Sequence, residues 1–184
     1  MPKALILLAQ GCEELEAVTV IDLLRRAAIE VVTAGLADGA VTASRGTVLV
    51  PDSTLEVEQR QTFDLVVLPG GLPGARHLEE DPRVLALLQR QAAAGRLVAA
   101  ICAAPKVLAV AGLLDGKRAT AYPGSLTVAD FPQLTLVADP VVVDGSIVTS
   151  RGPGTAMDFA LCLIELLMGE GCRRDVESQL VRAP

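Results

Sequence analysis

The sequence RLVAAICAAPKVLA, residues 96–109, decides the fold, because in it an apolar strand passes into a helix within one or two residues. The run over 96–101 is short and apolar, which is typical of a buried strand. Pro105 is tolerated only in the first turn of a helix, so a helix over 103–111 has to begin at about Ala103. A strand followed directly by a helix is the repeating unit of a parallel sheet.

The same alternation of strands and helices continues on both sides of this segment. We expect strands at 3–9, 29–34, 64–68, 96–101 and 146–149, and helices at 13–28, 82–94, 103–111, 155–167 and 173–180. A hairpin is expected within 40–50, turned at 44–46, and an edge strand or ribbon over 137–143, which contains a proline. The pattern predicts an α/β fold, a doubly wound and mostly parallel sheet with helices on both faces, formed by residues 1–184 as a single domain.

Composition excludes several classes of function. Apolar residues make up 51% of the 184 positions, and the formal net charge is −6. Such a surface offers little to a nucleic-acid backbone, so we expect no stable nucleic-acid binding. The apolar run at 3–9 is too short to span a membrane and has no cleavage site, so a cytoplasmic protein without membrane attachment is expected. Four cysteines without CxxC or CxxH spacing, and one histidine, predict free thiols and no metal site.

Cys102 is the candidate reactive thiol. A strained turn between strand and helix presents such a side chain above the sheet. The N–H groups and dipole of the following helix are expected to lower the thiol pKa well below about 8.5. The N–H of Ala103 is placed to stabilise an oxyanion. The alternative is an inert, buried cysteine, which we favour for Cys162 in its apolar helix; Cys12 lies near the same strand ends, and Cys172 has no evident role.

Acidic residues begin the first predicted helix. At about 100° per residue, Glu16 falls at the edge of the sheet-facing side and Glu13 falls within it. A partly desolvated carboxyl group keeps its proton, and it can donate a hydrogen bond to a thiolate or move a proton. The alternative, which applies most to Glu13 and Glu14, is an acidic cluster that only complements the helix dipole.

Glycine-rich loops follow two other strands. The first loop is the run LPGG at 68–71, in which the N–H of Gly71 could contact an oxyanion. The second, residues 150–155, could cap a helix or hold an anion. A purely structural role, as a turn or a helix cap, is equally compatible with each loop. A dinucleotide-binding fingerprint is absent. His77 precedes three acidic residues and is expected on the surface. Without a histidine base, a thiol peptidase is disfavoured.

Four segments together resemble the ThiJ/PfpI superfamily, in the branch of the Parkinsonism-associated deglycase and closest to its bacterial YajL-type members. They are GCEELE at 11–16, VLPGG at 67–71, AAICAAP at 99–105 and TSRGPGT at 149–155, in the family's order. The resemblance implies a flavodoxin-like α/β/α sandwich, a homodimer and no cofactor. Leu15 and Val18 project away from the sheet-facing side of the first helix, where apolar residues would suit a two-fold seam.

The resemblance also implies roles for single residues. The nucleophile maps onto Cys102, its protonated partner acid onto Glu16, and the oxyanion donors onto the N–H groups of Gly71 and Ala103. Positions that line the family's pocket or dimer seam map onto Glu13, Gly70, Arg45 and, from the partner subunit, Pro153. One departure is that some relatives carry a histidine where this chain has AYP at 121–123, so catalysis would depend on Cys102 and Glu16 alone.

The function that the resemblance implies is a deglycase or glyoxalase-like activity. The substrates would be reactive dicarbonyls such as methylglyoxal and their early adducts on proteins or nucleotides. The alternative is an oxidative-stress sensor and redox-regulated holdase chaperone, in which the same cysteine is oxidised to a sulfinate without turnover.

Overall fold

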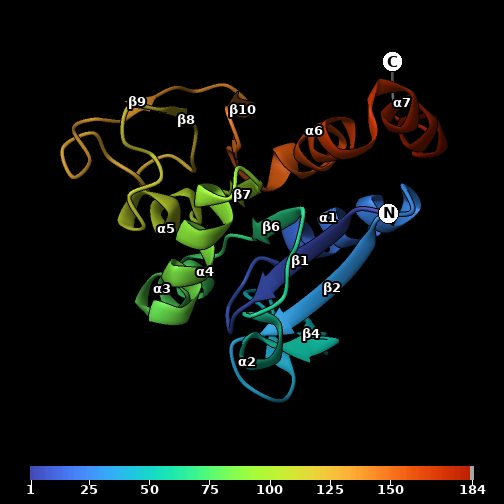
Figure 1. Cartoon of the computed structure of the whole chain (residues 1–184), viewed down its shortest axis with the longest axis horizontal. Helices are drawn as coiled ribbons and strands as arrows, with labels where there is room; N and C mark the ends of the chain where they lie inside the picture. Colours follow the sequence, from blue (N-terminus) through green and yellow to red (C-terminus); the bar gives the residue numbers. More distant parts are fainter. Residues whose placement is uncertain (183–184) are drawn as a thin grey trace.

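A seven-stranded sheet forms the centre of the computed structural model, which describes residues 1–182 (Figure 1). Its strand order is β10-β11-β7-β6-β1-β2-β5, and every neighbouring pair is parallel except β10 with β11. The strands are β1 (Lys3–Leu8), β2 (Glu30–Gly35), β5 (Ser53–Thr54), β6 (Leu65–Leu68), β7 (Leu97–Ile101), β10 (Val141–Asp144) and β11 (Ile147–Ser150). The predicted α/β class and mostly parallel sheet are confirmed.

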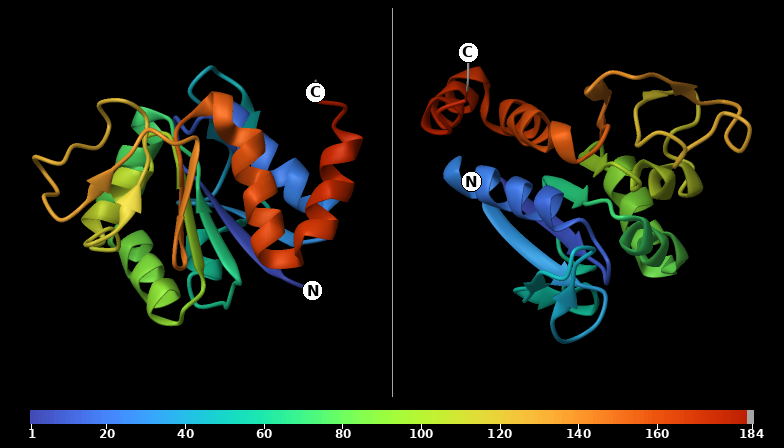
Figure 2. Two further views of the ribbon diagram at one scale, coloured as in Figure 1. Left: turned by 90° about the horizontal axis from the view of Figure 1, so that it is seen from above. Right: turned by 180° about the vertical axis from the view of Figure 1, so that it is seen from behind.

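Helices cover both faces of this sheet (Figure 2). One layer holds α1 (Glu14–Arg26), α6 (Ala156–Met168) and α7 (Glu170–Gln179), and the other holds α3 (Leu72–Glu80), α4 (Pro82–Ala93) and α5 (Pro105–Val110). Alternate residues of β1 face opposite layers, with Ile6 in one core and Leu5 and Leu7 in the other. This two-residue repeat explains why β1 is apolar throughout.

Short elements complete the chain. The strands β3 (Val41–Thr42) and β4 (Val48–Leu49) pair antiparallel and confirm the predicted hairpin. The strand β8 (Arg118–Ala119) pairs with β9 (Thr135–Leu136), α2 spans Leu55–Glu58, and a 3-10 turn spans Pro153–Thr155. None of the helices within residues 1–182 is long and apolar enough to cross a membrane.

Two predicted elements need correction, and one helix was not predicted. The strand expected over 137–143 begins only at Val141, because Pro140 has no N–H to donate to a ladder. The helix after β7 begins at Pro105 rather than Ala103, and a turn fills residues 102–104. The helix α3 was not expected, since its first turn contains Pro73 and Gly74; it forms because Ala75 and Leu78 pack into the core.

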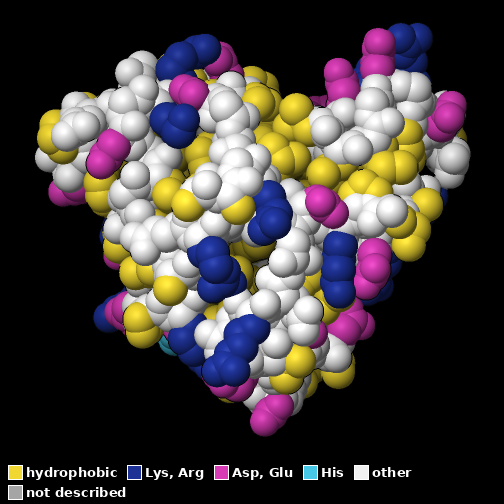
Figure 3. Space-filling view, in the orientation of Figure 1, with side chains coloured by type: hydrophobic (Ala, Val, Ile, Leu, Met, Phe, Trp, Pro, Cys, Tyr) yellow, Lys and Arg dark blue, Asp and Glu magenta, His cyan; other side chains and the backbone are white. Residues whose placement is uncertain are grey.

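Acidic and basic side chains both occur among apolar ones on the face drawn in Figure 3. Such mixing weakens any single-sign field that could hold a polyanion. The absence of stable nucleic-acid binding stays a prediction from the net charge of −6.

Candidate functional site

Cys102 occupies a strained turn at the carboxyl end of β7. Its φ is +65°, in the left-handed region that residues other than glycine rarely adopt. Neighbouring segments hold this conformation: the N–H of Cys102 donates to the carbonyl of Ser150 (2.9 Å), and its carbonyl accepts from the N–H of Tyr122 (2.8 Å) and the hydroxyl of Ser125 (3.3 Å). The predicted sharp turn at Cys102 is confirmed. The residue is 8% exposed, so only a small part of its surface is open to a reactant.

Two backbone N–H groups lie close enough to the sulfur to affect its charge. They belong to Gly71 and Ala103, and both lower the pKa of the thiol. The contribution of a helix dipole, in contrast, was overestimated from the sequence. Because α5 has only six residues and begins at Pro105, the donor at Ala103 belongs to the turn and acts as a single N–H group.

Glu16 is fully buried beside this sulfur, with 0% of its surface exposed. Its Oε2 accepts the N–H of Gly70 (2.7 Å), and its Oε1 has no hydrogen-bond partner among the described residues. Burial raises the pKa of Glu16 to about 7. The relative burial of the two acids is the reverse of what was expected. Glu13, which was expected on the inward side, precedes α1 and is half-buried, whereas Glu16 is fully buried.

Gly70 fits between the acid and the thiol. A Cβ at this position would lie 2.6 Å from Cβ of Cys102 and 2.8 Å from Oε2 of Glu16. Real Cβ atoms do not approach other atoms so closely, so only glycine allows the two side chains to be neighbours here.

The pKa of Cys102 departs from the expectation. Burial and the negative charge of Glu16 raise it to about 12, against the lowering effect of the Gly71 N–H. Two negative charges in one buried site are strongly disfavoured. Of the two protons that Glu16 and Cys102 can hold together, the pair therefore loses one near neutral pH and keeps the other. A thiolate therefore forms when Glu16 holds that remaining proton. The expectation of a thiol pKa well below about 8.5 is wrong for Cys102 beside an ionised Glu16.

The stability of the protein is expected to fall as pH rises from 4.5 through about 7, because only the folded state favours neutral Glu16. The folded pKa lies above the ordinary value, so the stabilisation is complete below the ordinary pKa and is lost above the folded one. The shift corresponds to about 3 kcal/mol. Urea unfolding of the wild type and of Glu16→Gln at about pH 4 and about pH 8 measures it. An equal pH dependence in both proteins would contradict this assignment.

The β3–β4 hairpin is tied to the start of α1. Glu13 accepts the hydroxyl of Ser44 (2.6 Å) and donates its N–H to the carbonyl of Gly70 (2.9 Å). Glu14 accepts the N–H of Arg45 (3.0 Å). Although burial raises the pKa of Glu14, backbone N–H donors and Ser44 lower it to about 2. Arg45 thus contributes its N–H, while its side chain is exposed and makes no hydrogen bond within residues 1–182.

Pro153 lines a surface cavity of about 240 Å³ together with Tyr122 and Arg151, and Cys102 does not line this cavity. A contribution of Pro153 to the site would require a second subunit and stays a prediction. Cys12 is fully buried, and burial raises its pKa to about 11, so its environment does not activate it.

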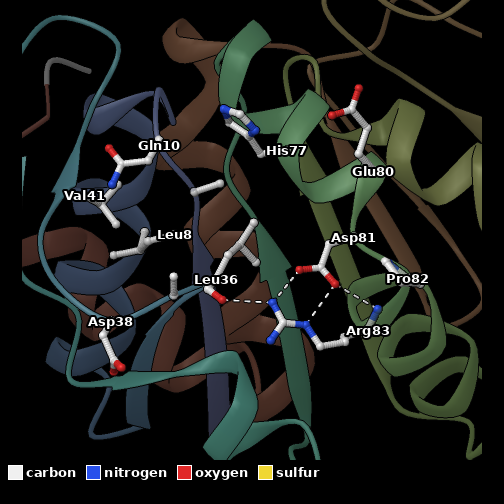
Figure 4. A pocket seen from close by; sticks show the side chains of 12 residues that line it. Leu8, Gln10, Leu36, Asp38, Val41, His77, Glu80, Asp81, Pro82 and Arg83 are labelled. Carbon is white, nitrogen blue, oxygen red and sulfur yellow. Dashed lines mark hydrogen bonds and ion pairs between the residues drawn. The ribbon is translucent and has the colours of Figure 1, made fainter.

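His77 belongs to a different cavity, of about 500 Å³, next to the ends of β1 and β2 (Figure 4). Arg83 at its edge bonds to Asp81 (2.7 Å) and to the carbonyl of Leu36 (2.9 Å). Neither Cys102 nor Glu16 lines this cavity. His77 is exposed, as predicted, and no hydrogen bond within 1–182 joins it to the thiol, so it offers no base for peptidase chemistry.

Sequence reasoning missed the residues that hold the backbone of Cys102. The N–H of Cys102 donates to Ser150, and its carbonyl accepts from Tyr122 and Ser125. No spacing in the sequence connects these three residues with position 102. The run at 121–123 stood out only as the place where a histidine is absent.

Comparison with known proteins agrees with this geometry. The model of the DJ-1/PfpI family matches residues 2–166. Protein dj-1beta of Drosophila melanogaster is 46% identical over 98% of this chain and 97% of its own length, and its crystal structure matches with a TM-score of 0.91 over 100% of this chain and 99% of that one. The structure titled Toxoplasma gondii DJ-1, oxidized, is 39% identical with a TM-score of 0.92 over 100% of both chains. A Caenorhabditis elegans protein named glutathione-independent glyoxalase DJR-1.2 is 38% identical over 90% of this chain and 89% of its own. The chain belongs to the DJ-1/PfpI family.

Proposed function

We propose that this chain is a cofactor-independent cysteine enzyme of the cytoplasm, with deglycase or glyoxalase-like activity on methylglyoxal and related dicarbonyls. Its substrates would include the early adducts of these compounds on proteins or nucleotides. The observation that carries the proposal is a sulfur that faces two backbone N–H donors beside a buried acid with a pKa of about 7. The 38% identity to a protein named as a glyoxalase supports it.

The reaction begins with addition of the Cys102 thiolate to the aldehyde carbon of methylglyoxal. This forms a C–S bond, and the new oxyanion accepts hydrogen bonds from the N–H groups of Gly71 and Ala103. Glu16 holds the proton that the thiol has lost and returns it to the substrate. A proton then moves from the former aldehyde carbon to the neighbouring carbon through an enediol, which leaves a thioester on Cys102. Water cleaves the thioester, which releases lactate and restores the thiol.

An adduct on an amine follows the same course, except that the amine leaves when the sulfur attacks. The net change is addition of one water to give lactate and the free amine, so no oxidant or reductant is consumed. A group with a pKa near the working pH is the efficient choice for moving these protons, and Glu16 meets that condition.

Lactate production from methylglyoxal tests the proposal. We expect steady turnover in the wild type, loss of turnover in Cys102→Ser, and a decrease of about 100-fold or more in Glu16→Gln. Negligible lactate formation by the wild type, at a rate shared by Glu16→Gln, would exclude the enzyme.

A sensor is the second candidate, because the same donors that would bind an oxyanion would bind a sulfinate on Cys102. Protonated Glu16 would donate to one of its oxygens. In this case peroxide adds two oxygen atoms to Cys102, as mass spectrometry would detect, and the oxidised protein suppresses aggregation of an unfolded client as a holdase. Turnover of methylglyoxal is not required.

We further propose a homodimer formed through the outer side of α1. Leu15 is 51% exposed and Val18 is 46% exposed, and the nearby hairpin exposes Val48. Apolar residues of this size on one face are typical of a two-fold contact. Light scattering is expected to give a dimeric mass for the wild type and a monomeric mass for Leu15→Glu. A monomeric wild type at micromolar concentration would exclude this dimer.

A further inference from the structure

A groove of about 400 Å³ lies beside the reactive turn, between α3 and α5. Ala103, whose N–H lowers the pKa of the thiol, lines it, and so does Ser125, which bonds to the carbonyl of Cys102. Leu72 follows the second donor, Gly71, and lines the groove with 70% of its surface exposed. The groove is therefore lined by one of the two residues that would hold the reacting oxygen, Ala103, and by the residue that follows the other.

Its walls carry equal numbers of opposite charges. Arg76, Glu79 and Glu80 come from α3, and Lys106 comes from α5. Leu72, Arg76 and Glu79 are spaced by four and three residues, which places them along one side of the helix. Lys106 follows Ala103 by three residues and directs its amine towards the same groove.

The charged side chains of the groove form two ion pairs of different length. Arg76 bonds to Glu80 at 2.8 Å, within one helix. Lys106 and Glu79 lie 3.6 Å apart across the groove, the longest ion pair among residues 1–182. This separation exceeds the usual length of a charged hydrogen bond, about 2.7–2.9 Å. A ligand with its own ammonium and carboxylate can therefore enter between these two side chains without losing a strong bond.

We propose that this groove binds the carrier of a dicarbonyl adduct and selects zwitterionic free amino acids over phosphate-bearing carriers. The inference rests on the proposed function, because it assumes that the adducted end reaches Cys102. Lys106 takes the carboxylate, Glu79 takes the ammonium, and Leu72 packs against the methylene chain that leads from these two groups to the adducted end. A phosphate-bearing carrier without an ammonium group leaves Glu79 without a partner, and the charge of Glu79 repels the phosphate that contacts Lys106.

Stable mimics allow binding to be measured without turnover. Nε-lactoyl-L-lysine places a lactoyl group at one end and the zwitterion at the other. Its Nα-acetyl methylamide has the same length without the two charges, and N-lactoyl-aminoethyl phosphate carries a phosphate instead. By calorimetry on the wild type we expect the zwitterion to bind about tenfold more tightly than either of the others. It should also protect Cys102 from iodoacetamide, which places the lactoyl end at the sulfur.

The variants Lys106→Gln and Glu79→Gln are each expected to abolish this preference. Lys117→Gln is the matched control, because Lys117 pairs with Asp144 away from the groove and should leave the preference intact. Equal binding of the capped mimic, failure of all three mimics to bind, or a preference that survives in Lys106→Gln would each overturn the inference. These experiments measure binding and need no turnover. A lack of lactate production would therefore refute the proposed enzyme activity without deciding whether the groove prefers zwitterions.

Discussion

Replacing Glu16 by Gln is expected to make Cys102 react faster with iodoacetamide while turnover of methylglyoxal falls. Burial and the charge of Glu16 together hold the pKa of Cys102 at about 12. Gln has nearly the same shape and can still accept the N–H of Gly70, but it carries no charge and cannot move a proton. Burial, the largest cause of the raised thiol pKa, remains in this variant, so only the part of the shift that comes from Glu16 is lost. For each unit by which the pKa falls, the gain in thiolate outweighs the loss of nucleophilicity, and alkylation accelerates about threefold.

Mass spectrometry of the alkylated peptide at neutral pH would measure this rate, and lactate production would measure turnover. Asp22→Asn is the control, because Asp22 lies on the same helix but is exposed and pairs with Arg26. It should change neither rate. Slower alkylation in Glu16→Gln would mean that Glu16 promotes thiolate formation more than its negative charge opposes it. This result would contradict the inference that Glu16 and Cys102 together carry one negative charge.

Replacing Gly70 by Ala is expected to destabilise the fold by about 3 kcal/mol, at the upper end for overpacking, because two of the three close contacts of the added methyl group are with atoms that are not the end of a flexible side chain. The methyl group would meet Cβ of Cys102 at 2.6 Å and the carbonyl oxygen of Ile101 at 2.9 Å. For a chain of this size the loss lowers Tm by about 9 °C. The substitution also forces Glu16 and Cys102 apart, so turnover should fall with stability.

Thermal unfolding followed by circular dichroism would measure this change. Gly171→Ala is the matched control, since Gly171 lies in α7 and an added Cβ there meets no atom within 4 Å. Alanine favours a helix over glycine by up to about 1 kcal/mol, so the control should melt at the same temperature or slightly higher. A Gly70→Ala protein that melts within about 2 °C of the wild type would show that the close approach at Gly70 can relax.

The sequence was most informative where a structural feature depends on neighbouring residues. The apolar runs located the central strands, and the position of Pro105 located the turn at Cys102, because both effects act within a few residues. The helix α3 was missed, since glycine and proline in its first turn disfavour a helix locally and only packing of Ala75 and Leu78 compensates for them. Tertiary contacts decided that element.

The candidate site was predictable in its members and not in its electrostatics. Cys102, Glu16, Gly71 and Ala103 do come together. The direction of the thiol pKa could not be obtained from the sequence, because it depends on how deeply Glu16 is buried and on its distance from the sulfur. Helical periodicity placed Glu16 only at the edge of the buried side. An error of a few tens of degrees in the angular position of a side chain about the helix axis is enough to mistake a buried acid for a half-buried one.

The hydrogen bond from the N–H of Tyr122 to the carbonyl of Cys102 also gives this protein an intrinsic optical probe. The chain has one tyrosine and no tryptophan, so its near-ultraviolet emission comes essentially from a single phenol ring attached to the reactive turn. A change of the turn at Cys102 that moves Tyr122 would alter this emission, which needs no introduced dye and has only the weak emission of three phenylalanines as background.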